Sequence, residues 1–550
     1  CKIKVLFAKG KKIFFKTRAE NTTREDRLIF FKEMTEDKFV AALDVGTTTL
    51  RCCIFNQKAQ LCGSGIDQIE LLYPEPGFVE IDPDKLWISV QRVIKLSLQD
   101  AGLTSNQITS LGLSVQRSSF TTWNKKTGTP YHNIIIWKDL RANKIVKELN
   151  KSFLMKGMRA TSKILYAFTR RKRFLAGSQM KVMNTQVTAR LLWVLENIPS
   201  LKKSIEKNEV HFGTLDTWLI YKLTGGEQHV TDVSNAACTG FFDPFTMDWA
   251  DWAFYIFGLP RTILPKILDT AGNFGYTSSY LFGSPIPIRS CVADQSASLF
   301  GSCGFKRGDF KITLGTGSFV NINTGSEPHA SITGLYPIVG WRINKETIYM
   351  AEGASNDTGT TIKWAQKIGI IKDPSESNDI ANSVNDANGV CFIPSFSGIQ
   401  APVNDGLAAA GFIGLKPTTS KGHMMRAILE SIVFRIHQLF EVVKKEIGLD
   451  FKLIRIDGGV SNNNFITQLI ADLTQIPIER PSSTEISVLG AAYLAGLASG
   501  VWNSKEEISR LRTVDQIFIP RPNIREEYKE QIELWKSAIS RFLNWYPDEY

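Results

Sequence analysis

The sequence predicts an α/β protein whose two large domains face each other across a cleft. Apolar, strand-like runs at 39–43, 310–314 and 453–456 each end in a glycine-containing turn rich in hydroxyl or acidic side chains. Segments with the apolar spacing of a helix alternate with strand-like runs along the chain, which is typical of α/β folds. The 550 residues are too many for one ordinary domain, so we expect two.

The predicted boundaries follow from the pattern of apolar residues. Residues 1–38 mix basic and apolar residues without a steady period, and we expect them to form an extension outside the fold. We expect the remainder to divide near 301–308, into domains at 39–303 and 304–550. The elements expected in the first domain are a strand at 39–43, a tight turn at 44–49, a strand at 50–55, a helix at 86–98 and a strand at 110–115. Those expected in the second domain are strands at 310–314, 319–322 and 453–456 and helices at 421–446, 489–498 and 526–545.

The composition narrows the class of protein. With 43% hydrophobic and 22% charged residues, the chain resembles a globular protein rather than a disordered one. It has no apolar run of about eighteen residues or more, so we expect no membrane-spanning helix. The eight cysteines form no CxxC pair and have no histidine at zinc-ligand spacing. We therefore expect reduced thiols and a cytoplasmic location.

The net charge of +11 is concentrated in one segment. Between Glu148 and Glu196 the chain carries ten basic residues and no acidic one. A local patch attracts anions at short range without making a whole protein a nucleic-acid binder. We therefore interpret residues 151–190 as a solvated surface insert outside the cleft, with a partner site as the alternative, and expect no nucleic-acid partner.

The segment from Asp44 to Arg51 carries the residue types that a bound triphosphate requires. Gly46 lets the backbone approach a ligand, Thr47–Thr49 supply hydroxyl donors and Arg51 supplies a positive charge. A carboxylate at the strand end, here Asp44, is suited to hold Mg²⁺ through its waters. Taken alone, the segment is equally typical of a simple hairpin.

Further along the chain, two turns and one aspartate have the features of a nucleotide-dependent active site. The turn at 315–318 has the sequence Gly-Thr-Gly-Ser and is suited to bind phosphates from the second domain. The segment 457–464 offers a Gly-Gly surface for a flat adenine ring, with an asparagine-rich helix cap as the alternative. Asp294, before a helix-like segment, is either an N-cap or the base that accepts the proton of a substrate hydroxyl.

Together these motifs resemble the FGGY carbohydrate kinases, and their order and spacing follow the glycerol kinases of that family most closely. The resemblance covers residues 40–505. Its motifs, in chain order, are Asp44–Arg51, Tyr73–Pro83, Gln116-Arg117, Trp137, Phe212–Leu219, Thr231-Asp232 with Ser234–Ala236, Asp294-Gln295, Gly315–Gly317 with Phe319, Glu352-Gly353, Gly359, Trp364, Asp457–Gly459 with Asn463, and Leu489–Ala492.

The resemblance implies two actin-like (ribonuclease H-like) domains around an interdomain cleft for ATP and substrate, with ATP and Mg²⁺ as cofactors. It implies ATP contacts at Asp44, Thr47, Thr48, Thr49, Arg51, Gly315, Thr316, Gly359, Gly458, Gly459 and Asn463. It implies substrate contacts at Arg117, Ser118, Trp137, Asp294, Gln295 and Phe319. Asp294 would be the catalytic base, and Asp44 would lie near Mg²⁺.

Two positions depart from the glycerol kinase pattern. The family has a glutamate where this chain has Ser118, so a carboxylate that accepts hydrogen bonds from substrate hydroxyls is missing. A tyrosine of the family has Thr185 as its nearest counterpart. With the basic insert, these departures resemble a divergent animal branch of the glycerol kinases and predict that glycerol itself binds poorly.

The expected function is transfer of the ATP γ-phosphoryl group to a hydroxyl of a small polyol, which is glycerol or a related polyol or sugar. The alternative is a regulatory or scaffold protein that binds nucleotide but has lost kinase activity. Asp44, Arg51, Asp294 and Thr316 are all present, which favours the active kinase. The sequence leaves open whether the protein forms a homo-oligomer.

Overall fold

The structure, a computed structural model, describes residues 6–8, 11–13, 38–483 and 485–547. Residues 1–38 and 39–550 are separate units. In the first unit, β1 (Leu6–Ala8) pairs antiparallel with β2 (Lys11–Ile13), and the rest of the expected extension before residue 38 lies outside the described residues.

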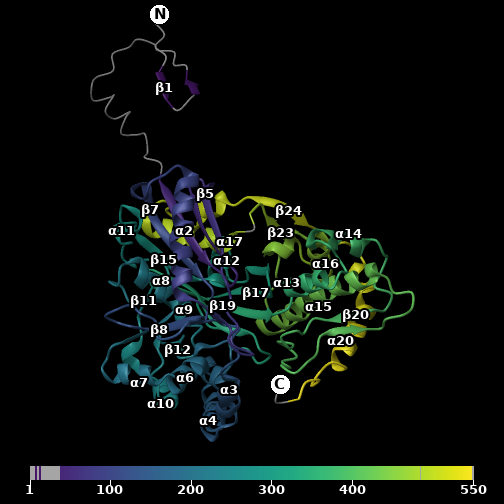
Figure 1. The fold of residues 1–550 in the computed structure, drawn as a ribbon. Helices are drawn as coiled ribbons and strands as arrows, with labels where there is room; N and C mark the ends of the chain where they lie inside the picture. Colours follow the sequence, from purple (N-terminus) through teal and green to yellow (C-terminus); the bar gives the residue numbers. More distant parts are fainter. Residues whose placement is uncertain (1–5, 9–10, 14–37, 484, 548–550) are drawn as a thin grey trace, which may run out of the picture. The chain divides into compact units, whose positions relative to one another are not determined.

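Two mixed sheets form the frame of residues 39–550 (Figure 1). The first has the strand order β15-β7-β3-β4-β5, and the second has the order β18-β19-β17-β16-β22-β23-β24. The first sheet consists of β3 (Phe39–Val45), β4 (Thr49–Phe55), β5 (Leu61–Gln68), β7 (Ile108–Val115) and β15 (Ile288–Ala293). The second consists of β16 (Phe310–Leu314), β17 (Ser318–Gly325), β18 (Tyr336–Ile343), β19 (Glu346–Ser355), β22 (Ile454–Asp457), β23 (Ile478–Pro481) and β24 (Val514–Phe518).

The two sheets repeat one arrangement. In the first, β3 is antiparallel to β4 and parallel to β7, and β7 is parallel to β15. In the second, β16 is antiparallel to β17 and parallel to β22, and β22 is parallel to β23. The turn of each hairpin therefore lies at the same edge as the C-terminal ends of the parallel strands, where α/β sheets bind their ligands. This repetition confirms the predicted actin-like fold.

Shorter strands and the helices complete the unit. A four-stranded sheet contains β6 (Glu80–Ile81), β8 (Phe120–Asn124), β9 (Ile134–Ile135) and β10 (Val210–Thr214). The longer helices are α2 (Pro83–Ala101), α3 (Asn143–Lys151), α4 (Phe153–Thr169), α5 (Lys172–Ser178), α6 (Val187–Asn197), α7 (Pro199–Glu206), α8 (Leu215–Leu223), α10 (Asp251–Phe257), α12 (Asp294–Gly301), α13 (Gly359–Lys367), α15 (Lys421–Ile447), α16 (Asn464–Thr474), α17 (Ile486–Ser499), α18 (Lys505–Leu511) and α20 (Lys529–Ser540). The expected elements are thus confirmed with shifted ends, and the last helix is shorter than expected. Among the described helices, none combines the length and the apolar content that a membrane crossing requires.

Helices α12 and α17 cross with their backbones in direct contact. A Cβ atom added at Gly490 would lie 1.9 Å from the carbonyl oxygen of Ala297, and one at Gly301 would lie 2.2 Å from that of Ile486. Gly112 brings β7 equally close to α17. Because no side chain fits at these points, the small-residue run of α17 lets a helix from the second half of the chain pack on the first sheet.

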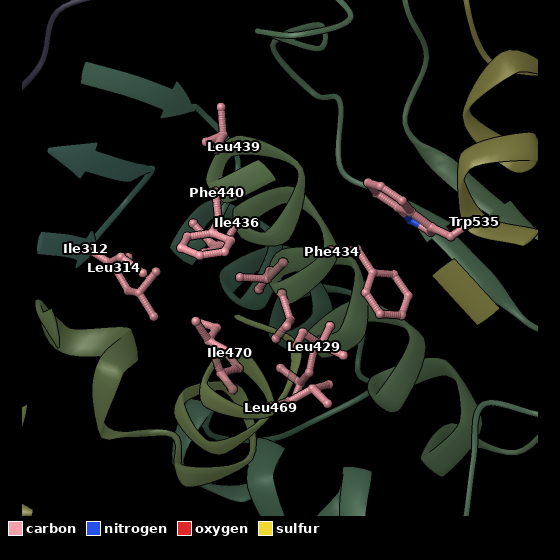
Figure 2. Close-up of a cluster of buried hydrophobic side chains, with 14 of the residues drawn as sticks. Ile312, Leu314, Leu429, Phe434, Ile436, Leu439, Phe440, Leu469, Ile470 and Trp535 are labelled. Carbon is pink, nitrogen blue, oxygen red and sulfur yellow. The ribbon is translucent and has the colours of Figure 1, made fainter. Parts of the chain in front are cut away.

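A cluster of buried hydrophobic side chains surrounds α15, and this helix supports the second sheet. The helix begins after the N-cap Ser420 and ends at Gly448, whose φ of 65° suits a glycine C-cap. Figure 2 shows its side chains between those of β16, α16 and α20. The labelled members are Ile312, Leu314, Leu429, Phe434, Ile436, Leu439, Phe440, Leu469, Ile470 and Trp535. This packing holds β16, and with it the second glycine turn, in place.

The basic segment 151–190 is helical, and most of its cations are exposed, as expected of a surface insert. Arg190 is the exception, because it is fully buried. Its guanidinium donates hydrogen bonds to the carbonyl oxygens of Ile136 at 2.5 Å and Ser118 at 2.8 Å. These acceptors replace the hydrogen bonds that the group would make with water at the surface. The prediction of a surface position is therefore wrong for Arg190.

Candidate active site

The β3–β4 hairpin presents the first Gly/Thr turn at the edge of the first sheet. The turn is closed by a hydrogen bond from the Gly46 N–H to the Thr49 carbonyl oxygen at 3.0 Å. Thr48 is exposed at its tip. The Thr47 hydroxyl accepts a hydrogen bond from the indole N–H of Trp137 at 3.0 Å. A residue predicted to bind nucleotide and one predicted to bind substrate are therefore in direct contact.

Asp44 lies in β3, two residues before this turn. Its carboxylate oxygens accept hydrogen bonds from Ser114 at 2.6 Å and from Ser487 at 2.9 Å. Burial raises the pKa of Asp44, while these hydroxyls and the charge of Arg51 oppose the shift. Arg51, which faces Asp44 across the hairpin, forms an ion pair with Glu485. Since Ser487 and Glu485 lie at the start of α17, the first turn is tied to the second half of the chain.

The second glycine turn, 315–317, is braced by the start of α13. The Gly359 N–H donates to the Gly315 carbonyl oxygen at 3.0 Å, and the Thr358 N–H donates to that of Thr316 at 3.1 Å. A Cβ atom at Gly359 would lie 2.6 Å from the Gly315 oxygen, so this position requires glycine. The Thr316 side chain is exposed, and the turn presents it at the edge of the second sheet.

Arg117 joins the carboxylate of Asp294, at the start of α12, to that of Glu352 in the second sheet. Its guanidinium donates to the two oxygens of Glu352 at 2.7 and 2.9 Å, and its Nε lies 3.2 Å from Asp294 Oδ1. Glu352 is buried in β19 and accepts a further hydrogen bond from Asn321 at 2.8 Å. The guanidinium lies 6.0 Å from the centre of the Phe319 ring. The predicted substrate residues Arg117, Asp294 and Phe319 are therefore brought together.

Asp294 is the first residue of α12, directly after β15. The N-cap position belongs to Ala293, so Asp294 is not the cap residue that the alternative interpretation requires. Its Oδ1 accepts from the Gln295 N–H at 2.8 Å, whereas its Oδ2 has no hydrogen-bond partner among the described residues. Burial raises the pKa of Asp294 to about 6, although Arg117 lowers it, and the charges of Glu352 and Asp44 raise it further. A carboxylate with this pKa is suited to accept a proton near neutral pH.

The hydroxyl of Ser118 already donates its proton in a hydrogen bond within the protein. Its Oγ donates to the Cys238 carbonyl oxygen at 3.0 Å, and its φ of 60° lies in the left-handed region. Its own carbonyl accepts a hydrogen bond from Arg190, which also binds the carbonyl oxygen of Ile136, the residue before Trp137. The buried side chain of Arg190 therefore links the segment that contains Ser118 to the segment that contains Trp137. Thr185 is exposed, and its carbonyl also accepts from Arg190, at 3.2 Å.

A buried ion pair joins β16 to β22 next to these residues. Lys311 Nζ lies 3.0 Å from Asp457 Oδ1, and Ser298 of α12 donates to Asp457 Oδ2 at 2.6 Å. Burial lowers the pKa of Lys311, and the charge of Asp457 opposes this shift. Gln295 accepts a hydrogen bond from Thr313 at 3.3 Å. These contacts fix the start of α12, and so Asp294, against the second sheet.

The predicted adenine surface consists of two glycines with different roles. Gly458 has a φ of 87°, and a Cβ atom there would lie 2.5 Å from a carbonyl oxygen of β16. Gly459 is exposed, with open space where a side chain would lie. Asn463 is the N-cap of α16, and its Oδ1 accepts from the Ile466 N–H at 3.1 Å. The capping interpretation is therefore confirmed for Asn463, whose Nδ2 also donates to a serine hydroxyl at 2.9 Å.

Several residues of this site are not predicted as site residues by the sequence. Glu352 carries a signal that could have found it, since it is a lone carboxylate in the buried part of a strand. Asn321 and Lys311 carry a related signal, a polar or charged residue at a buried position of β17 and β16. Ser487 has no local signal, because a serine in a helix is ordinarily a surface residue.

Comparison with known proteins identifies the family. The N-terminal domain of the FGGY family of carbohydrate kinases matches residues 39–301, and its C-terminal domain matches residues 310–499. Glycerol kinase 5 of Homo sapiens is 47% identical over 508 residues, which are 92% of this chain and 96% of that protein. Glycerol kinase 2 of Thermotoga maritima is 37% identical over 509 residues, 92% of this chain and 99% of that protein.

Solved structures agree with this assignment. A Plasmodium falciparum glycerol kinase with ADP has a TM-score of 0.81 and 29% identity, covering 92% of this chain and 98% of that one. A xylulose kinase from Lactobacillus acidophilus shares the fold, with a TM-score of 0.76 and 22% identity over 92% of this chain and 98% of that one. The chain therefore belongs to the FGGY family of carbohydrate kinases.

Proposed function

We propose that this protein transfers the γ-phosphoryl group of ATP to a hydroxyl of a small polyol, which is glycerol or a close relative of glycerol. The observation that carries the proposal is the position of Asp294. Because β15, β7 and β3 are parallel and in register, Asp294 follows β15 at the edge where the first Gly/Thr turn follows β3. A base and a phosphate-binding turn at one sheet edge are what phosphoryl transfer to a hydroxyl requires.

The donor side of the proposed site consists of the two glycine turns. Thr47, Thr48, Thr49 and Arg51 would bind the phosphates from the first sheet, and Gly315 and Thr316 from the second. Gly359 and Gly458 allow the backbone approach that shapes the second turn. Gly459 offers an open surface for the adenine ring, and the capping contacts of Asn463 support its position beside that surface. The ADP in the related Plasmodium glycerol kinase supports a nucleotide in this family fold.

The proposed acceptor side consists of Arg117, its neighbours Asp294 and Phe319, and the residues Trp137 and Gln295. Trp137 and Phe319 supply apolar walls for a carbon backbone, and Arg117 and Gln295 supply polar groups for its hydroxyls. Ser118 contributes only as an acceptor, because its proton is donated to Cys238. The carboxylate beside Arg117 is instead the buried Glu352.

In the proposed reaction, Asp294 accepts the proton of the substrate hydroxyl at Oδ2. The oxygen of the substrate hydroxyl forms a bond to the γ-phosphorus. As it does so, the bond between the γ-phosphorus and the β–γ bridging oxygen breaks, and ADP leaves. Arg117 and the Gln295 N–H hold Oδ1, so the carboxylate presents its other oxygen. Most of the rate gain in such a reaction comes from positioning and charge neutralisation, and the base adds to it.

The carboxylate of Asp44 fits a hard divalent cation held through its waters. The charge of Asp44 raises the pKa of Asp294, so a cation near both would relieve their repulsion. When bound, Mg²⁺ would neutralise charge on the phosphate oxygens. We also propose a cytoplasmic location, which the cysteines support, since five of the seven in the described part of the chain are buried thiols.

The test is a substrate screen with the purified full chain, in which ADP release is measured with a panel of polyols and sugars. We expect release that depends on a polyol, and we expect Asp294→Asn to bind ATP but to release ADP roughly 10²–10⁴-fold more slowly. Asp84→Asn, at an exposed position of α2, is the matched control. ATP binding by the wild type without turnover on any member of the panel would favour the lapsed, regulatory alternative.

A further inference from the structure

Helix α4 presents an apolar stripe to solvent. Phe153 is 93% exposed and Phe168 is 84% exposed, and between them Ile164 is 58% exposed. Positions 153, 164 and 168 are spaced by eleven and four residues, which places them on one line of an α-helix. Leu154 and Leu165 follow beside them with the same spacing of eleven, at 55% and 38% exposure. The five side chains lie on one side of α4 in two groups, Phe153 with Leu154 near its start and Ile164 with Leu165 and Phe168 near its end, and are here together called the α4 stripe.

The α4 stripe is not the face by which the helix packs on the protein. Within α4, Met155 is the one buried residue, and it points about 200° away from Phe153 around the helix axis. The helix packs against α3 and α5 and lies at the lower edge of the ribbon in Figure 1. Single exposed apolar residues are ordinary, but α4 exposes five large ones on one side, and exposed apolar patches mark interaction sites.

Cations lie along one side of the α4 stripe and at its C-terminal end. Lys156 and Lys163 lie about 60–80° around the helix from Phe153, and Arg170 and Arg171 follow its C-terminal end. None of these four side chains has an ion-pair partner in the described part of the chain, unlike Lys172 and Arg173 of the next helix, which pair with Glu327 and Asp243. No acidic residue lies between Glu148 and Glu196. The segment that carries the stripe is therefore strongly positive.

We propose that α4 docks flat on an anionic phospholipid membrane, with the α4 stripe at the boundary between headgroups and acyl chains. Phe153, Ile164 and Phe168 would enter the apolar region, and Lys156, Lys163, Arg170 and Arg171 would lie at the lipid phosphates. An amphipathic helix with aromatic and aliphatic residues on one face and lysines beside them is the type that binds in the plane of a membrane interface. Each cation near an anionic leaflet strengthens such binding.

The charge pattern favours a membrane over a second copy of this chain. In a two-fold symmetric dimer the same surface meets itself, so the cations around one α4 stripe would face those around the other. Such like charges repel unless carboxylates lie between them, and this segment contains none. An anionic bilayer instead supplies both the apolar layer and the opposite charge.

Co-sedimentation of the full chain with vesicles tests the proposal. We expect binding to vesicles of phosphatidylcholine mixed with phosphatidylserine, weaker binding at higher salt, and much weaker binding to phosphatidylcholine alone. Phe153→Ser with Phe168→Ser should lower the partition coefficient by about tenfold or more. Lys156→Gln with Lys163→Gln should lower it about fivefold per lysine.

Matched control variants distinguish vesicle binding through the α4 stripe from nonspecific binding through other exposed residues. Tyr255→Ser with Tyr280→Ser removes two aromatic side chains that are 90% and 73% exposed elsewhere, and Lys202→Gln with Lys203→Gln removes two exposed cations of α7. These variants should bind vesicles like the wild type, and all variants should keep the wild-type melting temperature. Absence of wild-type binding to the anionic vesicles would overturn the proposal. So would equal losses in the control variants, or a concentration-dependent dimer that the Phe153/Phe168 variant abolishes while vesicle binding persists.

Discussion

The guanidinium of Arg117 donates two hydrogen bonds to the buried carboxylate of Glu352, at 2.7 and 2.9 Å. Arg117 follows β7 of the first sheet and Glu352 lies in β19 of the second, so the pair joins the two halves of the protein. It also leaves Arg117 Nε directed at Asp294, 3.2 Å away. Because both partners are largely buried, we expect this pair to position the acceptor side of the site.

Glu352→Gln should lower kcat/KM for the acceptor by roughly ten- to a hundredfold and leave the affinity for ATP unchanged. The substitution weakens a charge-assisted hydrogen bond, worth about 1.5–3 kcal/mol. Steady-state kinetics with each substrate varied in turn measures both effects. Glu346→Gln, at the exposed start of the same strand, is the control. An equal loss of ATP affinity would show that Glu352 is a general structural residue instead.

Asp294→Asn should lower turnover by roughly 10²–10⁴-fold, the range for loss of a general base. The amide keeps the size of the side chain but cannot accept the proton of the substrate hydroxyl. Calorimetric titration should show that ATP binding persists, which separates loss of chemistry from loss of folding. Turnover at the wild-type rate on any accepted substrate would remove Asp294 from the mechanism.

The acid limb of the pH–rate profile should report Asp294. Burial raises its pKa to about 6, and a base must be ionised, so kcat/KM should fall as the pH drops through about 6 and level off above it. The charge of Glu352 contributes to this raised pKa, so in Glu352→Gln the limb should move to lower pH. A limb that stays at the same pH in that variant would contradict the assignment.

Thr316→Val should weaken ATP binding by roughly two- to tenfold, as expected for one lost hydrogen bond. Valine keeps the branched shape of threonine and removes only the hydroxyl. Isothermal titration with ATP measures the change, and Thr418→Val, at an exposed position before α15, is the control. Unchanged affinity in Thr316→Val would exclude this hydroxyl from the nucleotide site.

Glycerol should be a poor substrate for the wild type, and Ser118→Glu should improve its use by about ten- to a hundredfold. The new carboxylate would accept a hydrogen bond from a glycerol hydroxyl, which Ser118 cannot match as an ionised acceptor. The φ of 60° at this position disfavours a long side chain, so the melting temperature of the variant must be measured as well. Efficient use of glycerol by the wild type, with no gain in a stably folded variant, would contradict the prediction.

Local features of this chain were predictable because they depend on neighbouring residues. The strands and the turns at 44–49 and 315–318 follow from apolar runs and from glycines that permit tight backbone turns. The role of Asn463 was not decided by its sequence, because an asparagine after a glycine turn serves equally as a helix cap or as a ligand contact. The predicted surface position is wrong for Arg190 because its sequence neighbours are basic and exposed, whereas its own burial depends on carbonyl oxygens of two distant segments.

The sequence by itself determined the repeated strand–turn pattern and the chemistry that each turn can offer, since residue type decides what a side chain can donate, accept or neutralise. Only the tertiary structure decided which of these groups meet. Arg117 and Glu352 are separated by 235 positions, and Asp44 and Ser487 by 443. It also decided that α4 turns its phenylalanines to solvent. Such contacts depend on the order of strands in two sheets and on the glycine crossing of α12 and α17, which no local pattern encodes.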